Sequence, residues 1–132
     1  MCPMHPIHIG TCGWSYWSGV FYPRNLPSAE YLSYYAEKFH WVEVDSTFYA
    51  SPSPKMVQGW NAKTPARSSF ALKVPQTITH DKLMASCDAE VEEFLAAARL
   101  LEDKLQCCVL QFGYLEQGNK GDASTHLFFS HR

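Results

Sequence analysis

The chain has 132 residues, enough for one domain with a modest core, and its hydrophobic content of 46% indicates a folded globular protein. The net charge of −2 gives no overall attraction to nucleic acids or acidic membranes. The five cysteines lack the spacing of a disulfide framework, and the sequence shows neither a secretory leader nor an apolar stretch long enough to span a bilayer. We therefore expect a cytoplasmic protein with mostly free thiols and no membrane partner.

The N-terminal third predicts a strand, a loop and a helix. Residues 7–11 are rich in β-branched side chains and predict the first strand. The loop at 12–23 is dense in glycine and aromatic residues, so it must either pack under another element or bind something. Ser28 is a good N-cap for the first helix. The apolar face of this helix consists of Leu32, Tyr35, Ala36 and Phe39.

A second strand at 41–46 organises the rest of the chain. Val42 and Val44 point to one face of this strand, and Glu43 and Asp45 point to the other, because side chains alternate along a strand. Helical patterns precede and follow it, which predicts a parallel sheet with helices packed on the two valines. The carboxylates then face the other side of the sheet, where a charge needs a partner or a function.

The middle of the chain continues the alternation of helices and strands. Ser53 as N-cap and Pro54 at the first position predict a second helix. We expect its buried side to consist of Met56, Val57 and Trp60. A third strand follows at 70–74, Asp88 caps a third helix, and the nearly continuous apolar run at 107–112 predicts a fourth strand covered on both faces. The order β-α-β-α-β-α-β predicts parallel pairing through right-handed crossovers.

Five motifs occur together in a specific order. They are Ile9-Gly10-Thr11-Cys12-Gly13-Trp14-Ser15, Phe21-Tyr22-Pro23, Val42 to Tyr49, Phe70 to Pro75 with Ile78-Thr79-His80, and Leu110-Gln111-Phe112. In this combination the chain resembles the domain of unknown function 72 family, also called YecE-like, from about Ile7 to Tyr114. The resemblance implies a (β/α)₈ TIM barrel, and it implies no known reaction.

The length of the chain departs from that resemblance. A barrel of this type takes about 250 residues, whereas this sequence stops after its fourth predicted strand. We expect residues 1–114 to form the N-terminal half of a TIM barrel, an α/β half-barrel of about four parallel strands and three helices. Residues 115–132 are expected to be an irregular tail of a truncated or frame-shifted product. Open edges on the first and fourth strands then predict either self-association, in which a second copy covers them, or a fragment of marginal stability.

Polar side chains gather at the carboxyl ends of the predicted strands, where barrels of this kind place their active groups. Strand register turns Glu43, Asp45, Lys73 and Gln111 toward the inside of the barrel. The loops at the same end carry Trp14, Tyr16, Phe48, Tyr49 and His80. Two acids, a base, an amide and aromatic rings therefore surround one opening.

The first functional hypothesis is a hydrolase or lyase that acts, with a divalent metal, on a phosphorylated, sugar-like or nucleic-acid substrate. Glu43 or Asp45 is then a general base or metal ligand, and Lys73 binds an anion. His80 is a further catalytic candidate, and the aromatic residues with Gln111 bind the substrate. Some support comes only by fold analogy from other barrels with metal-bound carboxylates.

The same residues can also have purely structural roles. Glu43 and Lys73 can form a satisfied ion pair that is hydrogen-bonded to Gln111, and the aromatic residues of the loop at 12–23 can simply pack. A lone histidine such as His80 is more often a hydrogen-bonding loop residue than a catalyst. A zinc site at Cys2, His5, His8 and Cys12 is disfavoured because the N-terminus would have to fold back on itself.

Two further hypotheses involve no catalysis. The chain can be a binding module for a small ligand or for single-stranded nucleic acid, with the aromatics and the basic stretch at 51–82 making the contacts. It can also be a gene fragment without independent activity.

Overall fold

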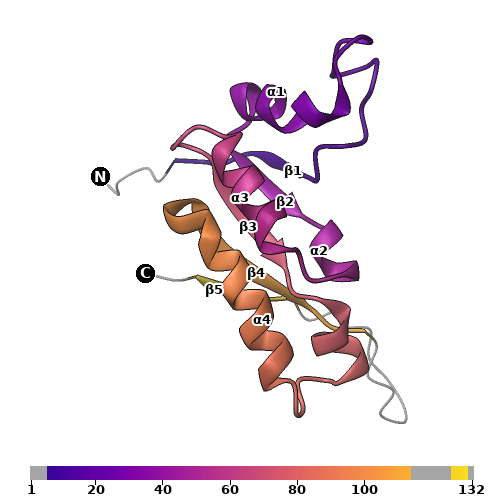
Figure 1. Cartoon of the computed structure of the whole chain (residues 1–132), viewed down its shortest axis with the longest axis vertical. Coiled ribbons are helices and arrows are strands. Elements are labelled where there is room, and N and C mark those ends of the chain that lie inside the picture. Colours follow the sequence, from indigo (N-terminus) through magenta and orange to yellow (C-terminus); the bar gives the residue numbers. More distant parts are fainter. Residues whose placement is uncertain (1–5, 114–125, 131–132) are drawn as a thin grey trace.

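The computed structural model describes residues 6–113 and the backbone of 126–130, and these form one sheet with helices on one face (Figure 1). The strands are β1 Gly10–Cys12, β2 Trp41–Val44, β3 Ser69–Lys73, β4 Leu105–Gln111 and β5 His126–Ser130. The helices are α1 Tyr31–Lys38, α2 Ser46–Tyr49, α3 Pro54–Ala62 and α4 Asp88–Ala98, with 3-10 turns at Ser28–Glu30 and Arg99–Lys104 and a π-helical turn at Thr77–Asp81. No helix in this described part is both long enough and apolar enough to cross a bilayer.

The sheet has the order β1-β2-β3-β4-β5. The first four strands pair in parallel, which confirms the expected βα architecture. β5 pairs antiparallel with β4. The sequence predicted an irregular tail at 115–132, and the strand at 126–130 corrects that expectation because β5 supplies backbone hydrogen bonds to the edge of β4. The other residues of that tail lie outside the described part.

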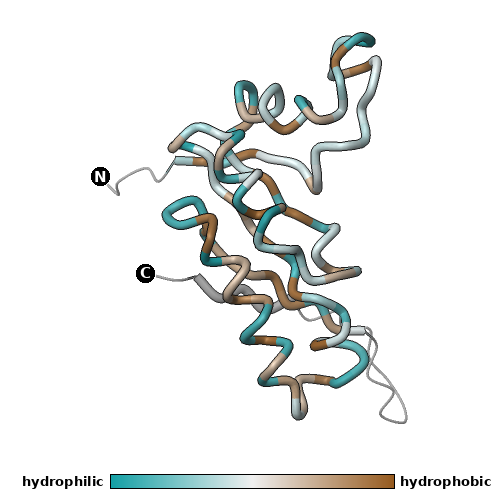
Figure 2. The backbone as a smooth tube through the Cα atoms, in the orientation of Figure 1, coloured by the Kyte–Doolittle hydropathy of each residue, from teal (hydrophilic) through white to brown (hydrophobic). Residues whose placement is uncertain are grey.

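The core lies between the sheet and the helices α1, α3 and α4. Val42 and Val44 on β2 and Phe70 and Leu72 on β3 are almost fully buried, and they belong to one apolar cluster that includes residues from all three helices. In Figure 2, apolar stretches, coloured brown, run along the strands of the sheet. The side chains between them, Glu43 among them, therefore point to the opposite surface, which we call the helix-free face.

The start of α3 agrees with the predicted cap. The Ser53 side chain accepts a hydrogen bond of 3.3 Å from the backbone N–H of Met56. The two other predicted caps are wrong. Ser28 begins a 3-10 turn and makes no capping bond, and Asp88 is the first residue of α4, preceded by Cys87 at the N-cap position.

Two strands are shorter than predicted. The first strand was expected at 7–11, but it begins at Gly10, which pairs with Trp41, the first residue of β2. Residues before Gly10 have no strand beside them in β2, and Ile7 and Ile9 are 89% and 70% exposed. The second strand ends at Val44 instead of residue 46, because the backbone turns into α2 at Asp45, with φ −85° and ψ −25°.

Burial differs from the prediction at two places. Val57 and Trp60 are buried on α3 as expected, whereas Met56 is half exposed. The fourth strand was expected at 107–112 to be covered on both faces, and Val109 and Leu110, which point to opposite faces, are buried. The side chains at 105–108 are only half-buried among the described residues, so the first half of β4 is less covered than β2 or β3.

The cap of α3 gives a test of the fold. Ser53→Ala removes the acceptor for the Met56 N–H, so we expect the free energy of unfolding to fall by about 1 kcal/mol in urea titrations followed by circular dichroism. Ser28→Ala is the matched control, since that hydroxyl caps nothing, and its change should stay within about 0.5 kcal/mol. Equal losses in the two variants would contradict the assigned cap.

Candidate functional site

An ion pair between neighbouring strands lies on the helix-free face. Lys73 Nζ lies 3.4 Å from Glu43 Oε1, and the two side chains are 19% and 33% exposed. Glu43 comes from β2, and Lys73 is the last residue of β3. The pair is therefore partly sheltered and still reachable from solvent, at the carboxyl ends of parallel strands.

Cys12 extends this pair onto the first strand. It lies opposite Glu43 in the register of β1 and β2, and its thiol donates a 3.7 Å hydrogen bond to Glu43 Oε1. Burial raises the pKa of the Cys12 thiol, the charges of Asp45 and Glu43 raise it further, and Lys73 opposes them. Cys12 thus stays protonated at neutral pH and acts here as a hydrogen-bond donor.

Asp45 is held by the aromatic loop. The Tyr16 hydroxyl donates a 3.1 Å hydrogen bond to Asp45 Oδ2, and this bond raises the pKa of the Tyr16 phenol. Gly13 allows Tyr16 to approach Asp45. Its φ is +79°, and its N–H donates a hydrogen bond of 2.7 Å to the Glu43 carbonyl. A Cβ at this position would lie 2.9 Å from the Tyr16 ring and 3.1 Å from Asp45 Oδ1.

Thr47 joins the ends of two strands beneath the site. Thr47 is buried, and its hydroxyl is the hydrogen-bond donor to two carbonyl oxygens. That of Lys73 lies at 2.6 Å and that of Val44 at 3.0 Å. These two contacts tie α2 to the last residue of β2 and to the last residue of β3. Thr47 was not among the predicted site residues, although it stands in the same motif as Glu43 and Asp45.

A second group of rings lies around His80. The Phe48 ring meets the His80 ring edge to face, with centroids 5.1 Å apart, and Thr79 Oγ1 shares a 2.8 Å hydrogen bond with His80 Nδ1. A Cβ at Gly113, just past β4, would lie 3.0 Å from the His80 ring. Tyr49 is 72% exposed beside Phe48. His80 therefore lies at the end of the sheet where β4 terminates, held by its own loop.

The structure does not unite all the predicted site residues. Trp14 packs edge to face against Trp60 of α3, with centroids 5.6 Å apart, so its ring faces the core. Gln111 lies on β4, on the same face as Glu43 by alternation, but no hydrogen bond joins it to Glu43 or Lys73 among the described residues. The five side chains that do lie together are Cys12, Tyr16, Glu43, Asp45 and Lys73, which we call the site cluster.

Metal ligands are few in this region. Within residues 6–113, no group of three or more His, Cys, Asp or Glu side chains has the arrangement of a metal site. Of the disfavoured zinc set, Cys2 and His5 lie outside the described residues, and the His8 ring lies against Trp41, with centroids 6.0 Å apart.

Comparison with known proteins agrees with this architecture. Residues 8–124 match the family described as "Protein of unknown function DUF72". The chain belongs to this family. It is 37% identical over 89 residues to the UPF0759 protein YecE of Escherichia coli, a match that covers 67% of this chain and 31% of YecE. It is 30% identical over 112 residues to the UPF0759 protein YunF of Bacillus subtilis, covering 80% of this chain and 39% of YunF.

Solved DUF72 structures share the fold. A DUF72 protein of Thermotoga maritima superposes with a TM-score of 0.70 and 32% identity, over 83% of this chain and 45% of that chain. A DUF72 protein of Enterococcus faecalis superposes with a TM-score of 0.68 and 23% identity, over 80% of this chain and 39% of that chain. The chain thus spans less than half the length of each of these four relatives.

The charges around Cys12 predict its reactivity. Glu43→Gln removes a negative charge that raises the Cys12 pKa, so alkylation by iodoacetamide at pH 8 should become faster by roughly threefold. Lys73→Met removes a charge that lowers this pKa, so alkylation should slow. Rates are measured for each cysteine residue by tandem mass spectrometry, which distinguishes Cys108 from its neighbour Cys107.

Cys108 provides the internal control for this measurement. Burial raises its pKa to about 11, with a further contribution from Cys107, and Glu43 and Lys73 are not among the causes. Its rate should be the same in all three proteins. Changes in the same direction at Cys12 in both variants would show that the assigned charges do not control the thiol.

Proposed function

We propose that the site cluster binds a small polar substrate with an anionic group and, in a complete family barrel, carries out acid–base chemistry of the hydrolase or lyase type. The observation that supports this most is the partly sheltered Glu43–Lys73 pair beside Asp45, at the carboxyl ends of parallel strands. Enzymes of barrel architecture place their reacting groups at these ends.

Lys73 is the anion-binding group. An ammonium has three donors, and the long contact to Glu43 occupies one of them. A phosphate or carboxylate of a substrate can take the remaining donors and compete with Glu43 for the ammonium. Binding of the anion then loosens the ion pair and leaves Glu43 available as a general base or acid.

Asp45 and the aromatic residues form the wall of the binding site. Tyr16 occupies Asp45 Oδ2, and Asp45 Oδ1 remains on the side of Gly13. Tyr16 and Tyr49 are 64% and 72% exposed, so their rings are accessible to a sugar or base ring. This combination suits a substrate that has both a ring and an anionic group.

A divalent metal remains part of the hypothesis through two carboxylates. Glu43 and Asp45 offer the hard oxygen ligands that Mg²⁺ prefers, and Mg²⁺ commonly takes its other ligands from water and substrate phosphates. The acid–base roles proposed above do not depend on such an ion. Addition of Mg²⁺ or Mn²⁺ during ligand titration tests its contribution separately.

The binding proposal is tested with inorganic phosphate and ribose 5-phosphate as probes. We expect saturable shifts of the backbone amides at 12–16, 43–47 and 73 in nuclear magnetic resonance titrations. Lys73→Met should weaken binding about tenfold, because a hydrogen bond to a charged group contributes about 1.5–3 kcal/mol. Glu43→Gln should strengthen binding, since it removes the carboxylate that competes for Lys73.

Lys55→Met is the matched control, because Lys55 is exposed on α3 away from the site cluster. It should bind like the unchanged protein. Affinity that is insensitive to Lys73→Met, or an equal loss in Lys55→Met, would refute the proposed anion site.

The contacts favour nucleic-acid binding less. Of the five bases at 51–82, Lys63 donates to the Ala29 carbonyl, Lys73 pairs with Glu43 and Lys82 pairs with Glu90. Three of the five charges are thus engaged within the chain. Binding of single-stranded nucleic acid through this stretch would have to weaken steeply as salt rises.

A further inference from the structure

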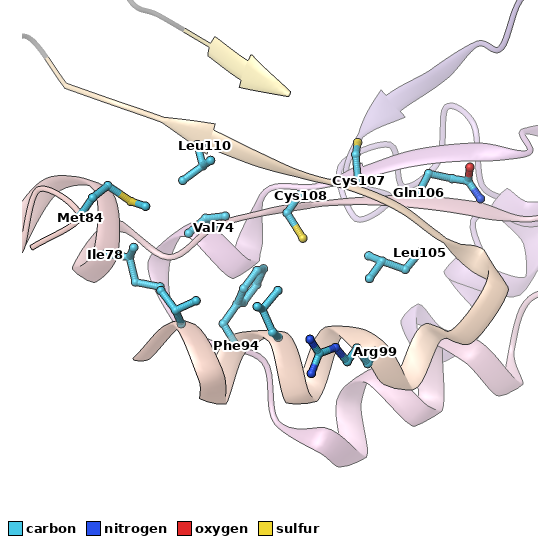
Figure 3. A pocket seen from close by; sticks show the side chains of 12 residues that line it. Val74, Ile78, Met84, Phe94, Arg99, Leu105, Gln106, Cys107, Cys108 and Leu110 are labelled. Carbon is cyan, nitrogen blue, oxygen red and sulfur yellow. The ribbon is translucent and has the colours of Figure 1, made fainter. Parts of the chain in front are cut away.

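The segment after β3 carries a histidine whose ring is held from several sides. It contains the π-helical turn Thr77–Asp81, a rare conformation that is frequent at functional sites. Ile78 of this turn is fully buried in the apolar core, and Figure 3 shows its side chain pointing toward α4. Thr79 is fully buried as well, and the half-buried His80 follows it directly. The core therefore fixes the backbone from which the His80 ring extends.

The His80 ring lies over the end of β3. It meets the ring of Phe48, which comes after β2, with centroids 5.1 Å apart. On another side it meets Gly113, which comes after β4, where a Cβ would lie 3.0 Å from His80 Cδ2 and 3.2 Å from Nε2. Since β3 runs between β2 and β4, a ring that contacts residues beyond both of them lies over the end of β3. Lys73, the proposed anion-binding group, is the last residue of that strand.

The Thr79 hydroxyl determines which ring nitrogen of His80 carries the proton. Its oxygen lies 2.8 Å from His80 Nδ1, and this is the one hydrogen bond of the hydroxyl among the described residues. A buried hydroxyl whose proton lacks an acceptor is unfavourable, so the hydroxyl donates its proton to Nδ1. In the neutral ring Nδ1 is then the acceptor, and the ring proton lies on Nε2.

The Nε2 edge of the ring remains for a ligand. Phe48 packs on the ring and Thr79 bonds Nδ1, so neither contact uses Nε2. Gly113, the described residue beside Nε2, has no side chain that could cover it. A neutral N–H suits an uncharged acceptor, such as a hydroxyl or carbonyl oxygen, whereas the Lys73 ammonium suits an anion.

We propose that His80 is a substrate-binding residue whose Nε2–H donates a hydrogen bond to a hydroxyl or carbonyl oxygen of a phosphorylated sugar, while Lys73 holds the phosphate. Thr79 is the positioning residue that keeps the ring proton on Nε2. The role of His80 rests on the proposed anion site at Lys73, and it adds the group that distinguishes a sugar phosphate from phosphate alone. A sugar phosphate carries both kinds of acceptor, as two different donors at one strand end require.

The protonated nitrogen is measured without a ligand, in long-range proton–nitrogen correlation spectra of the isotope-labelled full chain. At pH 8 we expect His80 to show the pattern of a ring protonated on Nε2 alone. Thr79→Val removes the hydroxyl and should lose this single pattern, whereas Thr79→Ser keeps the hydroxyl and should retain it. A ring protonated on Nδ1 in the unchanged chain, or a pattern that Thr79→Val leaves intact, overturns the assigned roles.

Binding is measured by nuclear magnetic resonance titration with ribose 5-phosphate and with inorganic phosphate. His80→Phe keeps an aromatic ring against Phe48 and removes the Nε2–H. It should weaken ribose 5-phosphate binding about fivefold, the contribution of one neutral hydrogen bond, and leave phosphate affinity unchanged because Lys73 is intact. His40→Phe is the matched control, since His40 is exposed just before β2, at the other end of the strands. It should bind both ligands like the unchanged chain, and thermal melting checks that both variants are folded.

The two ligands separate the two sites. Failure of inorganic phosphate to bind refutes the proposed anion site itself. Where phosphate binds and depends on Lys73, the role of His80 alone is overturned if His80→Phe leaves ribose 5-phosphate affinity unchanged. It is also overturned if His80→Phe weakens the two ligands equally, or if His40→Phe weakens ribose 5-phosphate as much.

Discussion

The alternation of side chains along β2 and β3 determines where every charged group of the site lies. Val42 and Val44 on β2, like Phe70 and Leu72 on β3, are almost fully buried against the helices. A slip of one residue in either strand would bring Glu43 or Lys73 into that core, at a cost far above the gain from any ion pair. The hydrophobic core thus holds the acid and the base on the other face, in register, before any contact forms between them.

What could be predicted from the sequence follows from this periodicity. The parallel order of four strands, the shared face of Glu43 and Lys73, and the Ser53 cap are all local patterns, and the structure has each of them. The start of β1 could not be predicted in this way, because a strand begins only where the neighbouring strand offers backbone partners. Ile9 has the right side chain for a strand but no partner in β2 beside it.

The rest of the site depends on contacts between segments far apart in the chain. Cys12 reaches Glu43 across 31 positions, and Tyr16 reaches Asp45 across 29, so no local pattern indicates either bond. The aromatic loop shows the same limit. Trp14 packs on α3, whereas Tyr16, two residues later, is exposed. The chain turns at Gly13, directly after β1, where φ is positive.

The two surfaces of the sheet can therefore serve separate functions. On β4, Cys108 and Leu110 point to the helix side of the sheet, whereas Val109 and Gln111 alternate onto the helix-free face that carries Glu43 and Lys73. Lys73, the last residue of β3, pairs with Val109 of β4 in the sheet. The packing of β4 therefore helps to fix the position of the Lys73 ammonium on the helix-free face, through the backbone register of the two strands.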